Sequence, residues 1–219
     1  MSDGKKKILN LYSGVGGNRK LWGDDCEITA VEYNESISKI YADLYPNDKI
    51  IIGDAHEYLR LNFEQYDFIW SSPPCQTHSR LNFSGRSRGK EYQYPSMKLY
   101  EEIILLQTFY KGKFVIENVK GYYEPLIKPT EIGRHYIWSN FPIKCSLSSS
   151  KVRNEKGQTL KSKMEQRGIV INDFRGYLGD RRQLINNCVE PEIGLFILNC
   201  AVGDFNKKFE TQTLFGNEM

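Results

Sequence analysis

Residues 8–17, ILNLYSGVGG, set the architecture of the first half of this 219-residue chain. An apolar run, typical of a buried strand, passes directly into a turn that contains Gly14, Gly16 and Gly17. Glycines let the backbone turn sharply and approach a ligand closely, and the helix expected next offers free N–H groups. The stretch therefore predicts a ligand at the carboxyl end of the first strand.

The alternation of strand and helix continues along the chain. After the first strand at 6–13, strands are expected at 27–33, 49–54, 66–72, 112–119 and 133–145, and helical spacing occurs at 34–45, 55–61 and 95–110. Strands joined by crossover helices predict an α/β fold with a doubly wound, mostly parallel, Rossmann-like sheet. Such sheets bind ligands at the carboxyl ends of their strands.

The composition limits the class of protein. The formal net charge is +3, which is compatible with a polyanionic partner but does not require one. The five cysteines are odd in number and contain no CxxC pair, so we expect reduced thiols in a cytoplasmic protein and no metal site. No apolar run approaches the roughly 18 residues that span a bilayer, so no membrane partner is expected.

Four regions follow from changes in the pattern. We expect a core at 1–145, a short basic insertion at 146–182, a helix at 183–205 that completes the core, and a tail at 206–219. The insertion is either a solvated surface segment or a contact with nucleic acid.

Carboxylates end the second and third strands. Glu32 lies about 15 positions past the glycines, where an acidic side chain takes both hydroxyls of a ribose. Asp54 can accept a hydrogen bond from an adenine amino group, although both carboxylates can instead cap the helices that follow. The glycine turn offers no basic residue for phosphates and is not of the GxxxxGK[ST] type. An adenosine without a phosphate chain fits best, and S-adenosylmethionine is the leading candidate.

Six ordered segments carry a family resemblance. They are LYSGVGG (11–17), VEYN (31–34), GDAHEYL (53–59), SSPPCQTHS (71–79), VIENV (115–119) and RRQLINNCVEPEIG (181–194). In these segments the chain resembles the DNA cytosine-C5 methyltransferases over residues 8–141 and about 181–201. The resemblance implies an S-adenosylmethionine-dependent methyltransferase sheet and an enzyme that methylates C5 of cytosine in duplex DNA. It also implies a compact, phage-like or orphan type related to restriction–modification, in a bacterial or phage-infected cell.

The chemistry of cytosine requires the same residue types. Its C5 atom is a poor nucleophile, and a thiolate that adds to C6 turns the ring into an enamine whose C5 can attack a methyl group. Cys75 is the expected nucleophile because the two prolines before it stop the strand, the alternative being a buried free cysteine. Its thiol, with an ordinary pKa of about 8.5, must lose its proton to attack. Glu117 can hydrogen-bond N3 of the ring. Asn118 would orient the loop, and Arg134 is a candidate cation for O2.

The resemblance also implies the residues around this centre. The expected cofactor-binding residues are Tyr12, Ser13, Gly14, Gly16, Gly17, Glu32, Tyr33, Asp54, Ala55, Pro73, Leu99, Asn187 and Val189. The expected nucleic-acid-binding residues are Gln76, Arg80, Arg86, Arg88, Lys90, Lys151, Arg153, Lys161 and Lys163. Because the target atom lies in a stacked duplex, the base must be turned out of the helix. The loop at 80–90 is either a basic lid over the nucleic acid or an ordinary polar loop.

Departures from the family pattern leave alternatives open. The first strand ends in Asn10-Leu11-Tyr12, where the family has an acidic residue and Phe, and His78 stands in CQTHS where the family has CQPFS. Asn186 and Glu190 replace the family's glycine and proline. The recognition region is short, so recognition is minimal or a second subunit supplies it. A tRNA-cytosine methyltransferase and a non-enzymatic nucleic-acid-binding module are the other two hypotheses.

Overall fold

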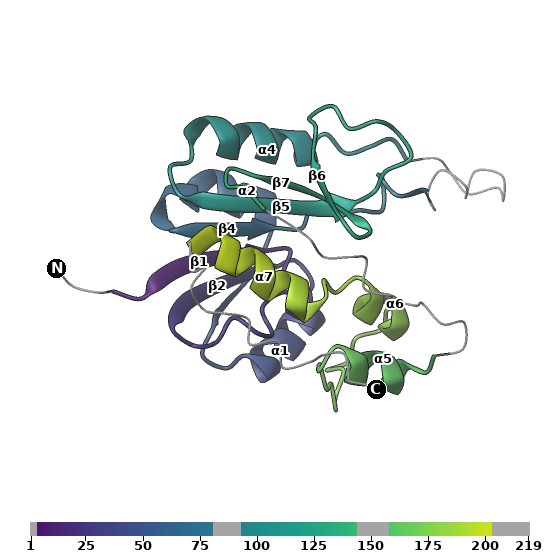
Figure 1. The fold of residues 1–219 in the computed structure, drawn as a ribbon. Coiled ribbons are helices and arrows are strands. Elements are labelled where there is room, and N and C mark those ends of the chain that lie inside the picture. The colour runs from purple at the N-terminus through teal and green to yellow at the C-terminus, as the bar shows by residue number, and fades with distance from the viewer. Residues whose placement is uncertain (1–3, 81–92, 144–157, 203–219) are drawn as a thin grey trace, which may run out of the picture.

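The computed structural model describes residues 4–80, 93–143 and 158–202 (Figure 1). They build a seven-stranded sheet in the order β3-β2-β1-β4-β5-β7-β6. The strands are β1 Lys6–Leu11, β2 Cys26–Glu32, β3 Lys49–Ile52, β4 Phe68–Ser71, β5 Lys113–Val119, β6 Thr130–Ile132 and β7 His135–Ser139. The first five are parallel, and β7 and β6 add antiparallel to the β5 edge.

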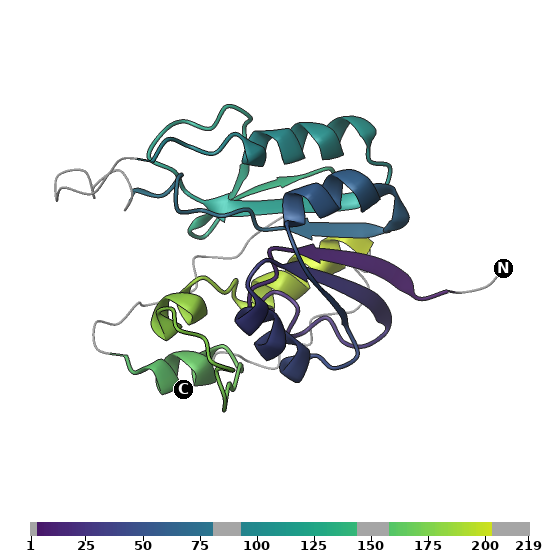
Figure 2. The same cartoon turned by 180° about the vertical axis from the view of Figure 1, so that it is seen from behind.

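Helices cover both faces of the sheet (Figures 1 and 2). They are α1 Glu35–Leu44, α2 Ala55–Asn62, α4 Lys98–Phe109, α5 Leu160–Gln166, α6 Arg181–Asn186 and α7 Pro191–Val202, with a 3₁₀ turn, η1, at Phe63–Gln65. No helix in these described ranges is long and apolar enough to cross a membrane.

Side chains alternate between the two faces of the sheet along each strand, so each face presents its own apolar residues to the helices that cover it. Leu9 and Leu11 of β1 point to the face where α2 and α4 bury Leu59 and Ile103. Ile8 points to the opposite face and packs with Ile197 of α7. Each face therefore has its own apolar core, as a doubly wound sheet requires.

The connection from β1 to β2 departs from the prediction, because the expected helix after the glycine turn is absent from the described residues 12–25. The segment forms turns, since Asn18 and Arg19 are drawn into the interior. The Asn18 amide donates to Asn10 Oδ1 at 2.8 Å, and the Arg19 guanidinium binds Asp48 at 2.8 and 3.0 Å. These hydrogen bonds of the buried Asn18 and Arg19 side chains stabilise the turns, and a helix does not form there.

The strands beside β5 also differ from the prediction. The expected strand at 133–145 is the shorter β7, and the unpredicted β6 pairs with it across a two-residue turn, Gly133-Arg134. Gly133 has φ +57, which glycine adopts without strain. The hairpin places Arg134 at its tip.

Part of the expected insertion at 146–182 is well packed. Ile169, Ile171 and Phe174 are buried with Val15 of the glycine turn and Ile40 of α1. Helix α6 continues across the expected boundary between 182 and 183. The described part of this segment therefore shares a core with the glycine turn and α1, while the four-region division stays a prediction.

Candidate active site

Cys75 lies in the loop that follows β4, at the carboxyl end of the parallel strands. The strand stops at Ser71, and the prolines at 73 and 74 carry the chain away from the sheet. The carbonyl of Cys75 accepts hydrogen bonds from the N–H groups of His78 and Ser79, both at 3.0 Å, so a tight turn presents the residue. The thiol is partly exposed, unlike that of buried Cys188.

The Glu-Asn-Val segment ends β5 on the same edge. The Asn118 amide donates to the carbonyl of Pro73 at 3.0 Å and thereby ties the cysteine loop to β5. The Glu117 carboxylate is buried, and its Oε1 lies 3.7 Å from Nε2 of His135 on the neighbouring strand β7. His135 was not among the predicted site residues, although it directly follows Arg134 in the sequence.

The charges around Cys75 have opposite effects on its ionisation. Burial raises the pKa of the Cys75 thiol, and the negative charge of Glu117 raises it further. The positive charge of Arg134 lowers it. The resting centre therefore favours the thiol, and attack requires that its proton be removed or that the charge on Glu117 be neutralised.

Arg134 reaches from the hairpin tip toward the late motif. Its Nη2 donates to the carbonyl of Asn186 at 3.3 Å and lies 3.4 Å from Oε1 of Glu190. Both oxygens of Glu190 are buried and lack a hydrogen-bond partner among the described residues. The two positions where this motif departs from the family are thus the ones that contact Arg134.

His78 belongs to the same turn as Cys75, and its N–H donates to the Cys75 carbonyl. The ring is buried, with Nδ1 at 2.5 Å from the Tyr123 hydroxyl and Nε2 without a partner among the described residues. Burial lowers the pKa of His78, so the imidazole is neutral near neutral pH.

The two acidic residues at the strand ends behave differently. Glu32 accepts from the N–H groups of Gly14 at 3.0 Å and Asn34 at 2.9 Å, while Asn34 itself caps α1. Asp54 does cap α2, because its Oδ1 accepts from the N–H groups of His56 and Glu57. Its other oxygen, Oδ2, faces Lys98 at 3.4 Å. The capping alternative therefore holds for Asp54 and fails for Glu32.

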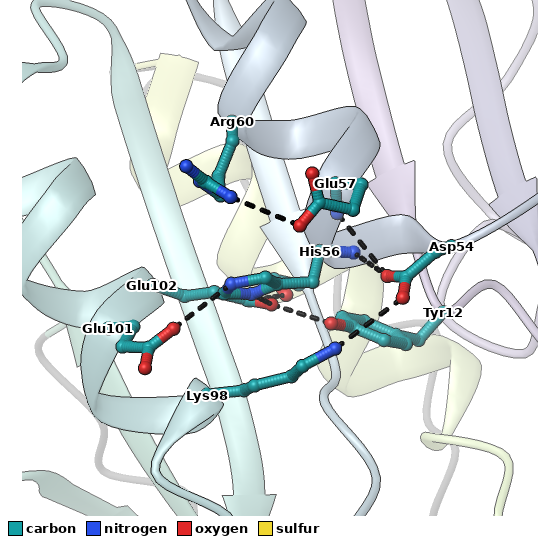
Figure 3. Close-up of polar contacts among 9 residues, drawn as sticks. Tyr12, Asp54, His56, Glu57, Arg60, Lys98, Glu101 and Glu102 are labelled. Atoms are coloured by element: carbon teal, nitrogen blue, oxygen red, sulfur yellow. Dashed lines mark hydrogen bonds and ion pairs between the residues drawn. The ribbon is translucent and has the colours of Figure 1, made fainter.

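A buried carboxylate lies at the centre of a polar cluster that the sequence analysis did not identify (Figure 3). Glu102 of α4 is fully buried and accepts from the hydroxyls of Tyr12 and Ser71, both at 2.6 Å. Nδ1 of His56 is 3.1 Å from the same carboxylate, and its Nε2 is 3.1 Å from Glu101. These hydrogen bonds compensate for the burial of the Glu102 carboxylate in an apolar core, where a carboxylate without partners would be costly.

This cluster holds Tyr12 in an unusual conformation. Tyr12 has φ +54, which is uncommon for a residue other than glycine. Burial and then the charge of Glu102 raise the pKa of Tyr12, so the phenol remains protonated and serves as a donor. Glu102 could have been suspected from sequence, because it lies three positions from Leu99 on the apolar face of a predicted helix.

The other predicted cofactor-binding residues differ in how far they are exposed to solvent. Ala55 and Leu99 are buried in the core below the glycine turn, Tyr33 is 80% exposed, and Asn187 is exposed. Val189 is buried, and its carbonyl lies so close to Gly17 that a Cβ there would approach it to 2.6 Å. The late motif therefore packs directly against the glycine turn.

The predicted nucleic-acid contacts are only partly described. Arg86, Arg88, Lys90, Lys151 and Arg153 lie outside the described residues. Gln76 and Arg80 are exposed beside Cys75, with Arg80 Nε donating to the carbonyl of Gly121 at 3.3 Å. Lys161 is 84% exposed, whereas Lys163 is buried and donates to Asn186 Oδ1 at 2.6 Å.

A cavity of about 660 Å³ lies at the opposite edge of the sheet. It is lined by the first residues of β1, β4 and β5, Lys6, Phe68 and Lys113, and by Val202 at the end of α7. None of the predicted site residues lines it. The polar side chains, and not this cavity, identify the candidate site.

The sequence of the chain matches a known protein family. The model of the C-5 cytosine-specific DNA methylase family matches residues 6–128, which is more than half of the chain and includes Cys75 and Glu117. The chain belongs to this family. Membership confirms the predicted mostly parallel α/β methyltransferase fold and S-adenosylmethionine as the cofactor.

Individual family members with curated names resemble the chain over part of their length. A tRNA (cytosine(38)-C(5))-methyltransferase from Spodoptera frugiperda is 28% identical over 160 residues, 67% of this chain and 47% of that protein. The protein of the same name from Homo sapiens is 28% identical over 155 residues, 58% of this chain and 39% of that protein. A crystal structure of a Spodoptera frugiperda DNMT2 mutant is 30% identical with a TM-score of 0.40, and covers 54% of this chain and 37% of that one. The chain spans less than half the length of these curated relatives.

The residues at the glycine turn fit the family's cofactor. Ser13 Oγ is buried and has no hydrogen-bond partner within the described part of the chain. A Cβ built on Gly14 or Gly53 would meet no atom within 4 Å, so open space borders the ends of β1 and β3. An unsatisfied hydroxyl beside open space is where a polar ligand is expected.

Proposed function

We propose that this chain transfers a methyl group from S-adenosylmethionine to C5 of a cytosine in a nucleic acid. One observation carries the proposal: the Asn118 amide donates to the carbonyl of Pro73 at 3.0 Å, and so ties the Cys75 loop to the strand that bears Glu117. A cysteine and a carboxyl group arranged in this way are what addition to a pyrimidine ring requires.

Each residue of this centre has a defined task. When bound, S-adenosylmethionine supplies an electrophilic methyl group, and Ser13, Gly14, Glu32 and Asp54 are the residues that would hold it. Cys75 Sγ forms a bond to C6 of the base, and protonated Glu117 donates to N3, where the electron pair of the broken ring double bond gathers. Once C5 has taken the methyl group, N3 returns its proton to Glu117, and loss of the C5 proton to a base restores the ring double bond and expels the Cys75 thiolate. Asn118 keeps the loop in place.

A tRNA cytosine is the first candidate substrate. The curated relatives from Spodoptera frugiperda, Homo sapiens and Bos taurus are all named tRNA (cytosine(38)-C(5))-methyltransferases. Duplex DNA, the substrate first inferred from the sequence, is the second candidate, supported by the description of the family model. A compact phage-borne or orphan enzyme of restriction–modification in the cytoplasm, with or without a second subunit for recognition, belongs to this second candidate.

The test uses a substrate analogue that stalls the reaction. Transfer RNA and duplex DNA that contain 5-fluorocytosine are incubated with the chain and labelled S-adenosylmethionine. Fluorine cannot leave C5 as a proton does, so the Cys75 adduct should persist in denaturant on whichever nucleic acid is the substrate. Cys75→Ala should abolish the adduct, whereas Cys26→Ala, which removes a half-buried thiol at the far end of β2, should retain it.

The outcomes separate the hypotheses. An adduct with Cys75→Ala would refute the nucleophile, and an adduct with DNA alone would refute the tRNA assignment. If neither nucleic acid gives an adduct or methyl transfer, while both still bind, the non-enzymatic binding module is the correct function.

A further inference from the structure

Four basic side chains from three elements surround the late motif. Lys163 and Arg167 are one turn apart at the end of α5, Arg182 is in α6, and Arg134 is at the hairpin tip. Asn186 joins two of them, because Lys163 Nζ donates to its Oδ1 at 2.6 Å and Arg134 Nη2 donates to its carbonyl at 3.3 Å. We call these four side chains the α5–α6 basic cluster.

Within the described part of the chain, the cluster holds more positive charge than the neighbouring acidic side chains neutralise. Lys163 and Arg167 are only 8% and 6% exposed. The buried Nε of Arg167 has no hydrogen-bond partner in residues 4–80, 93–143 and 158–202. Glu190 contacts the cluster through Arg134, and Asp180 caps α6 through its side chain. A buried guanidinium nitrogen without a hydrogen-bond partner is costly, and a native protein rarely leaves one without an acceptor or a ligand.

The electrostatics of Lys163 show that the four cations lie near one another. Burial lowers the pKa of Lys163, and the positive charges of Arg182, Arg167 and Arg134 lower it further. An anion placed among them would remove this repulsion. Arg134 and Arg182 are exposed, so the cluster has a side that faces solvent.

We propose that the α5–α6 basic cluster binds a phosphodiester group of the nucleic-acid substrate, with Arg167 as its central ligand. A guanidinium and an ammonium group together match the several oxygens of a phosphate. Arg134 connects the cluster to the catalytic centre, because its charge also acts on Cys75. The site thus anchors the strand beside the base that is modified. The inference rests on the proposed function in that the phosphate belongs to its substrate.

Binding at several salt concentrations tests the site. The dissociation constants of a stem–loop RNA and of a duplex DNA of equal length are measured by fluorescence anisotropy, without cofactor. Arg167→Gln should weaken binding of the substrate nucleic acid about tenfold and reduce the slope of log K against log salt by about one, the effect of one phosphate contact. Lys39→Gln on α1 is the matched control, because it also removes one positive charge and Lys39 is 58% exposed and pairs with Glu35. We expect it to change affinity less than about twofold.

A second measurement separates binding from folding. Arg167→Gln removes a buried charge whose Nε has no partner among the described residues, so its melting temperature without ligand should equal or exceed that of the wild type. Inorganic phosphate should raise the melting temperature of the wild type and not that of the variant. If Arg167→Gln proves unstable, exposed Arg182→Gln replaces it in the binding assay, with the same reduced slope expected.

Three results would overturn the site. Equal losses with Arg167→Gln and Lys39→Gln would mean that only the net charge of the chain matters. Unchanged affinity and slope with Arg167→Gln would exclude the phosphate contact. Weaker binding of S-adenosylhomocysteine with unchanged nucleic-acid binding would assign the anion to the cofactor's carboxylate. The proposed function fails separately, through absence of the Cys75 adduct, which these measurements do not depend on.

Discussion

At the residue scale, Cys75 and Glu117 are coupled. The carboxylate raises the pKa of the thiol, so an ionised Glu117 opposes formation of the nucleophile. Protonation of Glu117 both provides the donor for N3 and removes the charge that holds the proton on sulfur. One proton therefore prepares both residues for the addition.

Glu117→Gln tests this coupling without a substrate. The neutral amide should lower the pKa of Cys75, so the rate of Cys75 alkylation by iodoacetamide, followed by mass spectrometry, should reach half its maximum at lower pH than in the wild type. Methyl transfer should fall by at least about a hundredfold, because general acid–base groups contribute that much. Glu131→Gln, at an exposed site on β6, is the control and should change neither. An unchanged or higher alkylation midpoint in Glu117→Gln would contradict the coupling.

Glu102 is the second residue whose charge matters. Glu102→Gln replaces one acceptor oxygen with a donor facing the hydroxyls of Tyr12 and Ser71, which should cost about 1–3 kcal/mol of unfolding free energy. The adjacent Glu101→Gln should cost less than about 1 kcal/mol, because that side chain is 62% exposed. Urea unfolding measures both values. Calorimetry should also show weaker S-adenosylhomocysteine binding for Glu102→Gln alone, and equal effects of the two variants would argue against the cluster as the support of Tyr12.

At the element scale, the start of α2 combines a structural and a functional task in one side chain. Asp54 Oδ1 caps the helix, while Oδ2 is directed to Lys98 and the open end of β3. Burial tends to raise the pKa of Asp54, but the two N–H groups and Lys98 outweigh it and lower the pKa. The carboxylate is therefore ionised at neutral pH.

Two substitutions separate these tasks. Asn caps helices as well as Asp does but cannot pair with Lys98, so Asp54→Asn should lower the melting temperature less than Asp54→Ala does and should weaken S-adenosylhomocysteine binding measured by calorimetry. Asp54→Ala should lose both, with a stability cost of about 1 kcal/mol. If Asp54→Asn binds the cofactor product as tightly as the wild type, the residue is a helix cap and nothing more.

At the scale of the whole molecule, two of the three histidines make stability depend on pH in opposite directions. His78 has a lowered pKa because of burial, so the unfolded chain takes up its proton first and stability falls as the pH drops below about 6.5. The hydrogen bond to Glu102 raises the pKa of His56, so its contribution is complete below about pH 6.5 and is lost as the pH rises through its folded pKa.

Urea unfolding between about pH 7.5 and about pH 5.5 reveals the two effects. Relative to the wild type, His78→Phe should gain stability as the pH falls, and His56→Gln should lose stability over the same range. Each variant serves as the control for the other. The same direction of change in both would show that the histidines do not titrate as their surroundings imply.

Local patterns in the sequence predicted the positions of six of the seven described strands, the glycine turn, the cysteine loop and the Glu-Asn-Val strand end. These features depend on interactions between neighbours in the chain: the two-residue period of a strand, the missing N–H of proline and the freedom of glycine. The glycine turn, the cysteine loop and the Glu-Asn-Val segment also indicated the family and therefore the cofactor.

Only the tertiary structure decided which polar residues are buried together. Tyr12 and Glu102 are 90 positions apart, and Arg134 meets Asn186 across 52 positions. Contacts of this kind arise when separate helices and strands pack, so no local pattern encodes them. For the same reason the helix expected after Gly17 did not form: burial of Asn18 and Arg19 against Asn10 and Asp48 outweighed the local preference. The raised pKa of Cys75, the support of Tyr12 and the burial of Arg167 all depend on that packing.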